Sequence, residues 1–63
     1  MRLVTFNPQI GDTYTNPKGL LFVIRDIYRS AGNALVIVHG EPTIFTLSEI
    51  VDAVIIGYWT LIN

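Results

Sequence analysis

Few side chains in this 63-residue sequence could carry out acid–base chemistry, and His39 is the first candidate because it is the only histidine. A histidine titrates near neutral pH, at a pKa of about 6.5, so His39 could act as a general base. The alternative is a structural role, because His39 follows an apolar segment and precedes Gly40, which is typical of a turn. We favour a histidine at a hairpin end that makes a local hydrogen bond.

Charged residues gather at one other place, where Asp26 stands beside Arg25 and close to Arg29. These residues could form a polar site on a strand, or they could pair at the surface, where such pairs contribute little stability. No serine or threonine has the histidine at a spacing typical of nucleophilic catalysis, and the sequence contains no phosphate-binding glycine-rich loop. The sequence therefore predicts a protein that is not an enzyme, with no catalytic residue and no cofactor.

Cysteine is absent, which excludes disulfides and thiolate metal sites and fits a reducing compartment. A structural zinc site needs several cysteine or histidine ligands, so we predict no metal. The longest apolar stretch, Ala53–Ile62, is far shorter than the roughly 18 residues that a membrane-spanning helix needs. The first nine residues also lack the apolar segment of a secretory signal. We therefore expect a cytoplasmic protein that does not bind membranes.

Basic and aromatic residues suggest one alternative function, which is binding of nucleic acid. Small barrels bind single strands through aromatic rings that stack on bases and basic side chains that contact phosphates. The residues that could form such a face are Arg2, Lys18, Arg25, Tyr28 and Arg29. Four basic side chains against five acidic ones leave a net charge of −1, which argues against a nucleic-acid footprint. Nucleic-acid binding is therefore our second hypothesis.

The apolar run Leu20–Tyr28 is the segment around which we expect the fold to be organised. It is rich in the β-branched and aromatic residues that favour strands, and turn residues flank it at Asn16–Gly19 and Ser30–Asn33. Its large apolar residues do not alternate strictly, because the step from Ile24 to Ile27 is three positions. A β-bulge near Arg25 and Asp26 would keep Phe22, Ile24 and Ile27 on one face.

Four further segments read as strands or strand-like elements. Ala34–His39 is apolar on both faces, which is typical of a central strand. We expect Gly40-Glu41-Pro42 to connect it tightly to Thr43–Thr46, which pairs back as a hairpin. Met1–Phe6 is predicted as a short edge strand, and Ile55–Ile62 as the last strand with a bend at Gly57. Before the central run, Gly11-Asp12 is expected to form a turn that directs Tyr14 into the core.

The period of the apolar residues changes at Leu47, which predicts a short helix from Leu47 to Val54. Its apolar residues recur at helical spacing, at Leu47, Ile50, Val51 and Val54. Thr46 and Glu49 have the spacing of a capping box, in which each side chain accepts a hydrogen bond from the other residue's backbone N–H. A helix this short needs packing against a sheet to persist.

This order of elements resembles the small SH3-like β-barrel proteins that are common in phage and mobile-element genomes. The resemblance covers residues 10–62 and is carried by Gly11-Asp12-x-Tyr14, by Gly19-x-x-Phe22-x-Ile24-x-x-Ile27, by the hairpin and by the helix that begins Leu47-Ser48. It implies a single SH3-like domain over residues 1–63. The fold would be mainly β, a barrel of about five antiparallel strands with one short helix before the last strand. It also implies a viral accessory protein that binds other proteins, and it assigns no catalytic residue.

Protein binding is our leading hypothesis, with a host protein as the partner if the protein is phage-encoded. A hydrophobic fraction of 51% and a mean hydropathy of +0.50 are high for so short a chain. A core of this size is marginal, and a partner subunit is one of the usual ways to stabilise it. Arg25, Tyr28 and Arg29 form one candidate surface for a partner.

We also predict a homo-oligomer, with a dimer favoured, because the last strand is apolar on both faces. The residues expected at this interface are Tyr58, Trp59, Leu61 and Ile62. In the alternative, the helix and the N-terminal strand cover both faces of that strand within one monomer. Which face of the strand points inward is left open by the alternation.

Overall fold

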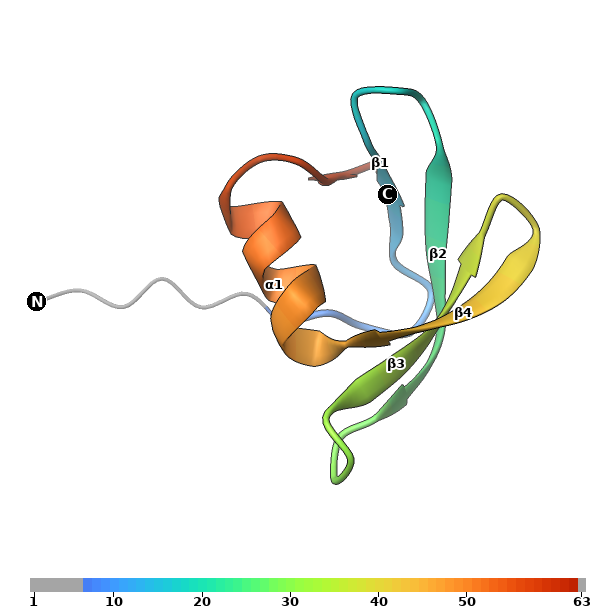
Figure 1. The fold of residues 1–63 in the computed structure, drawn as a ribbon, viewed down its shortest axis with the longest axis vertical. Helices are drawn as coiled ribbons and strands as arrows, with labels where there is room; N and C mark the ends of the chain where they lie inside the picture. The colour runs from blue at the N-terminus through green and yellow to red at the C-terminus, as the bar shows by residue number, and fades with distance from the viewer. Residues whose placement is uncertain (1–6, 63) are drawn as a thin grey trace, which may run out of the picture.

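The computed structural model describes residues 7–62, which form five antiparallel strands and one helix (Figure 1). The elements in chain order are β1 (Thr13–Thr15), β2 (Leu21–Tyr28), β3 (Asn33–Val38), β4 (Glu41–Thr46), α1 (Leu47–Ile55) and β5 (Thr60–Leu61). The predicted mainly β architecture, with one short helix before the last strand, is confirmed. The predicted edge strand Met1–Phe6 lies outside the described residues.

The strands form one open sheet in the order β4-β3-β2-β1-β5. β4 and β5 are its two edges, and within residues 7–62 no pairing joins them. The described strands therefore do not close into the barrel that the sequence analysis predicted. The physical reason is the length of β5, which has two residues. Among the described strands it pairs with β1 alone, through Tyr14 opposite Leu61 and Thr15 opposite Thr60.

The predicted bulge in β2 is confirmed, at the predicted position. Ile24 pairs with Val36 of β3, but the next pair is Asp26 with Leu35, so Arg25 is the extra residue. Because one extra residue resets the alternation, Ile27 returns to the face that holds Phe22 and Ile24.

The turn between β3 and β4 consists of His39 and Gly40, and not of Gly40-Glu41-Pro42 as predicted. Both turn residues have positive φ, 51° and 83°, as a two-residue type I′ hairpin requires. Glu41 and Pro42 belong to β4 instead. A proline fits there because β4 is an edge strand, where a missing N–H need not break the ladder.

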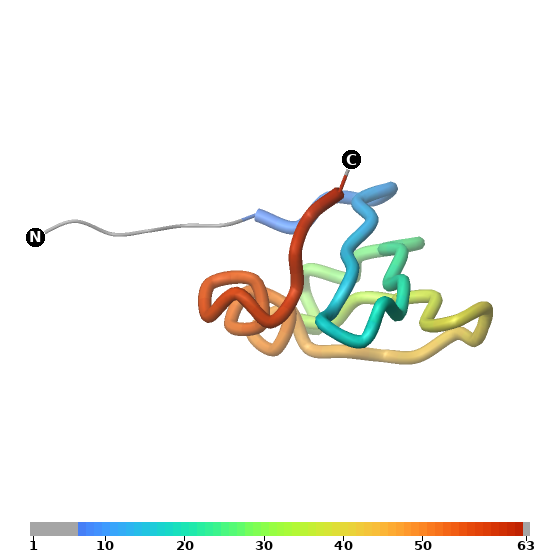
Figure 2. The backbone as a smooth tube through the Cα atoms, turned by 90° about the horizontal axis from the view of Figure 1, so that it is seen from above, coloured from blue at the N-terminus to red at the C-terminus, as the bar shows by residue number. Residues whose placement is uncertain are grey.

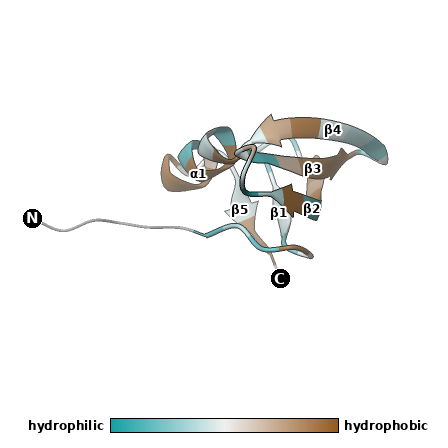
Figure 3. Cartoon of the chain, turned by 90° about the horizontal axis from the view of Figure 1, so that it is seen from below, coloured by the Kyte–Doolittle hydropathy of each residue, from teal (hydrophilic) through white to brown (hydrophobic). Residues whose placement is uncertain are grey.

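The helix is confirmed, and its N-terminus has the predicted capping box. The Thr46 hydroxyl accepts from the backbone N–H of Glu49 at 3.1 Å, and the Glu49 carboxylate accepts from the backbone N–H of Thr46 at 2.9 Å. Hydrophilic and hydrophobic residues both occur along α1 (Figure 3). Its Ile50 is fully buried, which shows that the apolar side of the helix packs on the sheet.

The prediction of a strand over Ile55–Ile62 is wrong for most of its length. The helix continues to Ile55, and Gly57 then takes a φ of 86°. The Gly57 N–H donates to the Val54 carbonyl and the Tyr58 N–H to the Ala53 carbonyl, which is the Schellman arrangement that ends many helices. The β-branched residues before Gly57 therefore complete a helix, and only Thr60–Leu61 is a strand.

The core lies between α1 and the side of the sheet that we call the inner face. Tyr14, Phe22, Ile24, Ala34 and Val36 contribute buried side chains from the strands. Trp59, in the segment between α1 and β5, stacks on Phe22 with ring centroids 4.3 Å apart. The same ring lies 5.5 Å from that of Tyr14 and 5.4 Å from that of Phe45. Figure 2 shows α1 to one side of the strands, with the chain returning from it to β1.

Candidate protein-binding surfaces

The side of the sheet opposite α1, which we call the outer face, is apolar, and within residues 7–62 no helix covers it. Strand residues alternate between the two faces, so the neighbours of the buried Phe22, Ile24 and Val36 point outward. These outward residues are Leu21, Val23, Leu35 and Ile37, joined by Ile44 of β4. Leu21 and Ile44 are exposed and the other three are half-buried.

Strand pairing places these side chains next to one another. Val23 pairs with Ile37, and Leu35 pairs with Ile44. The backbone N–H of His39 donates to the Leu21 carbonyl at 3.3 Å, which brings the end of β3 beside the start of β2. The outer face is therefore one continuous apolar patch over three strands.

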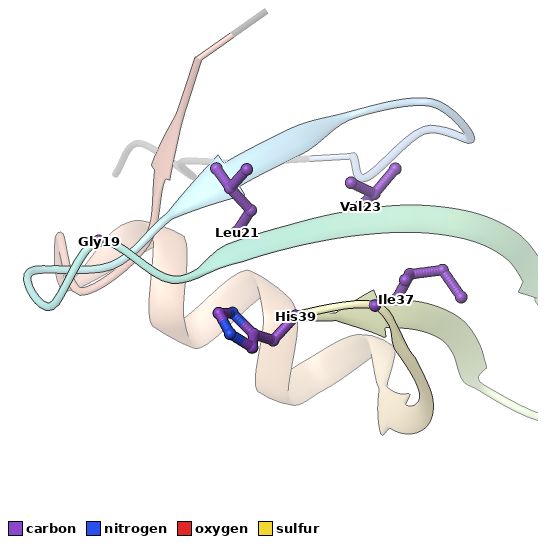
Figure 4. A pocket seen from close by; sticks show the side chains of 6 residues that line it. Gly19, Leu21, Val23, Ile37 and His39 are labelled. Carbon is purple, nitrogen blue, oxygen red and sulfur yellow. The ribbon is translucent and has the colours of Figure 1, made fainter.

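A groove of about 280 Å³ occupies one end of this patch, between the β1–β2 turn and the β3–β4 turn (Figure 4). Its lining residues are Gly19, Leu21, Val23, Ile37, His39 and Gly40. Leu21 and Val23 come from β2, whereas Ile37 and His39 come from the end of β3 and its turn (Figure 4). The walls are aliphatic and His39 is the one side chain in the lining that can ionise, so the groove suits an apolar group of a partner.

The predicted partner residues Arg25, Tyr28 and Arg29 follow the apolar patch along β2. Arg25 is the exposed extra residue of the bulge, and Tyr28 lies on the outer face because it pairs with Asn33, two positions from Leu35. Arg29 begins the β2–β3 turn, and its guanidinium donates to the Pro8 carbonyl at 3.2 Å. Arg29 therefore uses one N–H for a hydrogen bond within the fold. Arg25 and Tyr28 extend the outer face.

The four predicted interface residues near the C-terminus do not share one environment. Tyr58, Leu61 and Ile62 are exposed, whereas Trp59 is 6% exposed and belongs to the core. Trp59 therefore differs from the prediction, because the Schellman turn folds its ring back onto the inner face. The backbone N–H of Trp59 donates to the Ala53 carbonyl of α1 at 3.0 Å. Ile55 and Ile56, which precede these residues in the chain, are also exposed.

The core contains one hydrogen-bonded hydroxyl among its described side chains, that of Tyr14. Its hydroxyl donates to the Asp12 carboxylate at 3.0 Å, and the same carboxylate oxygen accepts from the Gln9 N–H at 2.9 Å. Burial, with the hydrogen bond to Asp12 as a second cause, raises the pKa of Tyr14 well above its ordinary value of 10.0. Tyr14 therefore stays protonated at neutral pH and ties the Gln9–Asp12 turn to the core.

The described residues form neither a cluster of metal ligands nor a membrane-spanning helix. In the part of the chain that the structure describes, no three histidine or acidic side chains come together to hold a metal ion. α1 is nine residues long. Residues 7–62 contain no helix that is long and apolar enough to cross a bilayer.

The outer face is the candidate surface that the sequence analysis missed. The sequence pattern that could have indicated it lies in β3, whose residues are apolar at both odd and even positions. That pattern is typical of a central strand buried on both sides, but here it belongs to a strand with one covered and one open face.

Comparison of the chain with protein-family models, with characterised proteins and with solved structures finds no match.

Proposed function

We propose that this protein is a non-enzymatic protein-binding module whose partner docks on the outer face. The observation that supports the proposal is the continuous apolar patch of Leu21, Val23, Leu35, Ile37 and Ile44, with its groove. Contiguous exposed apolar surface on a small protein is a common mark of a partner site. The sheet already has a helix on its inner face, so the outer patch contributes little to the core.

The chemistry of the patch supports a protein partner over other classes. An aliphatic side chain of a partner would fill the groove. Arg25 and Tyr28, at the far end of β2, would supply polar and aromatic contacts at the rim of the apolar patch. Interfaces combine an apolar centre with a more polar rim in this way. The described basic residues are few and one N–H of Arg29 is engaged with Pro8, so the basic footprint for nucleic acid is weak.

The finer parts of the proposal rest on the resemblance to small SH3-like barrel proteins. The strand order β4-β3-β2-β1-β5 with a helix before β5 supports an SH3-like relation, in which the barrel remains open between β4 and β5. We extend the proposal to a phage-encoded accessory protein that acts in the cytoplasm on a host protein.

Affinity capture with two lysine variants tests the proposal. Ile37→Lys places a charge in the groove of the outer face, and Ser48→Lys places the same charge on the exposed side of α1. A protein captured from host lysate by the parent chain is purified, and its affinity for each variant is measured. We expect at least about a tenfold loss with Ile37→Lys, equivalent to about 1.4 kcal/mol, and no change with Ser48→Lys.

Two results would contradict the proposal. One is recovery of nucleic acid, shown by loss of the captured material on nuclease treatment. The other is a partner whose affinity for Ile37→Lys equals that for the parent chain, which would place the site elsewhere.

A further inference from the structure

The two edges of the sheet differ in the backbone groups that they offer to another strand. β3 and β4 are joined by a two-residue turn, so Val38 and Glu41 next to the turn form a hydrogen-bonded pair. Pairs alternate along an antiparallel ladder, so the residues of β4 that point their N–H and C=O groups away from β3 are Pro42, Ile44 and Thr46.

The β4 edge is largely closed to pairing. Pro42 has no N–H to donate. The Thr46 N–H already donates to the Glu49 carboxylate at 2.9 Å as part of the capping box. Of the residues of β4, Ile44 alone retains an outward N–H. Proline and a capped end are among the devices that protect edge strands from association.

Within the described residues, β5 has neither a proline nor a capped N–H that would block its edge. The Ile62 N–H donates to the Thr13 carbonyl at 2.9 Å, and Thr60 pairs with Thr15. By alternation, Leu61 between them points its N–H and C=O away from β1. The segment that leads into this edge and forms it is apolar: Ile55, Ile56, Tyr58, Leu61 and Ile62 are each between 41% and 76% exposed. The segment Ala53–Ile62 contains no charged residue.

We propose that the occupant of this edge is a second copy of the chain, paired antiparallel through β5 across a two-fold axis. Leu61 then lies opposite the partner's Leu61, and the two residues exchange both of their backbone hydrogen bonds. A single outward N–H and a single outward C=O on one residue are self-complementary under this symmetry. Because the segment is uncharged, two copies meet without repulsion between like charges.

A dimer through β5 needs contacts beyond the strand pairing. A standard interface buries about 800 Å² on each partner, roughly a fifth of the 4334 Å² that the chain exposes. One pair of backbone hydrogen bonds is far too small for a stable dimer. In our proposal, the five exposed side chains of this segment supply the remaining contact, and Ile56, at 76%, is the most exposed of them.

Paired proline variants at the two edges test the dimer. Leu61→Pro removes the outward N–H of β5, and Ile44→Pro is the matched control that removes the outward N–H of β4. Mass in solution is measured by light scattering and sedimentation at micromolar concentration, and folding is followed by the fluorescence of Trp59, the only tryptophan. We expect the parent chain and Ile44→Pro to have twice the 7.1 kDa mass of the monomer, and Leu61→Pro to be monomeric with an unchanged tryptophan spectrum.

The proposal is overturned by a parent chain that is monomeric, or by a dimer that survives Leu61→Pro or is broken by Ile44→Pro with the fold intact. If either proline variant unfolds, Ile56→Lys decides, because it charges the same surface from the end of the helix without touching the strand. A dimer that this variant leaves intact overturns the proposal. The dimer and the partner site can be tested separately. We expect Ile37→Lys to leave the dimer unchanged and Leu61→Pro to leave the affinity for the partner unchanged.

Discussion

The inner and outer faces of the sheet are built from the same kinds of residue and have different surroundings. On β3, Val36 points inward and is fully buried, while its neighbour Ile37 points outward into the groove. The difference comes from α1 and Trp59, which cover the inner face alone. Apolar character therefore does not identify the core in so small a sheet. Among the described residues, the face that α1 and Trp59 cover holds the core, and the opposite face is the one that we propose for binding.

The most severe test of this comparison places the same lysine on each face of β3. Val36→Lys buries a charge that has no partner, which costs more than the roughly 3–5 kcal/mol that a core of this size provides. We expect this variant to be unfolded, whereas Ile37→Lys directs its ammonium group to water and keeps its fold. Circular dichroism and Trp59 fluorescence show whether each of the two variants is folded. Two variants of equal stability would show that the faces are not distinguished by burial.

A smaller effect is expected from the cap that holds α1 over the inner face. Thr46→Ala removes the acceptor for the Glu49 N–H and should cost about 0.5–2 kcal/mol. For a domain of this size, about 1 kcal/mol corresponds to a fall of about 4–8 °C in Tm. Thr43→Ala, an exposed substitution in the same strand, is the control and should leave Tm almost unchanged. Equal melting of the two variants would mean that the capping box contributes no stability.

The smallest effect concerns the polar group that the inner face does contain, the Tyr14 hydroxyl. Tyr14→Phe removes its hydrogen bond to Asp12, at a cost of about 0.5–1.5 kcal/mol near neutral pH. Burial raises the pKa of Tyr14 in the folded state, so above about pH 10 the unfolded chain loses this proton first. Stability of the parent chain then falls as the pH rises.

Melting of the parent chain and of Tyr14→Phe between about pH 8 and pH 11 isolates this contribution, because the other ionisable groups are common to both. The stability difference between the two proteins should shrink as the pH rises above about 10. A difference that stays constant across the range would show that Tyr14 titrates alike in the folded and unfolded chains.

Those parts of the fold that depend on local patterns could be predicted from the sequence. The bulge follows from the three-residue step between Ile24 and Ile27, and the start of the helix follows from the spacing of Thr46 and Glu49. Both features are fixed by residues within one turn or one strand. The inward position of Tyr14 could be predicted for a similar reason, since Gly11-Asp12 turns the chain just before it.

The rest depended on contacts between distant segments. Ile55 and Ile56 favour a strand by residue type, but the Schellman turn at Gly57 and the stacking of Trp59 on Phe22 determine that they end a helix. Charged and aromatic residues are conspicuous in a sequence, which is why the pattern pointed to Arg25, Tyr28 and Arg29 as the partner surface. The larger part of the proposed surface, at Leu21, Val23 and Ile37, could be found only once α1 was known to lie on the opposite face.

The pairing of β5 with β1 has a consequence for the entropy of the chain. β1 to β4 are joined in order by short turns, so each of their pairings closes a small loop. The bond from Ile62 to Thr13 instead closes a loop that contains nearly every described residue. Closure of a longer loop costs more entropy, and here two residues of strand and the burial of Trp59 must offset it. The shortest strand of the sheet therefore carries its longest-range connection.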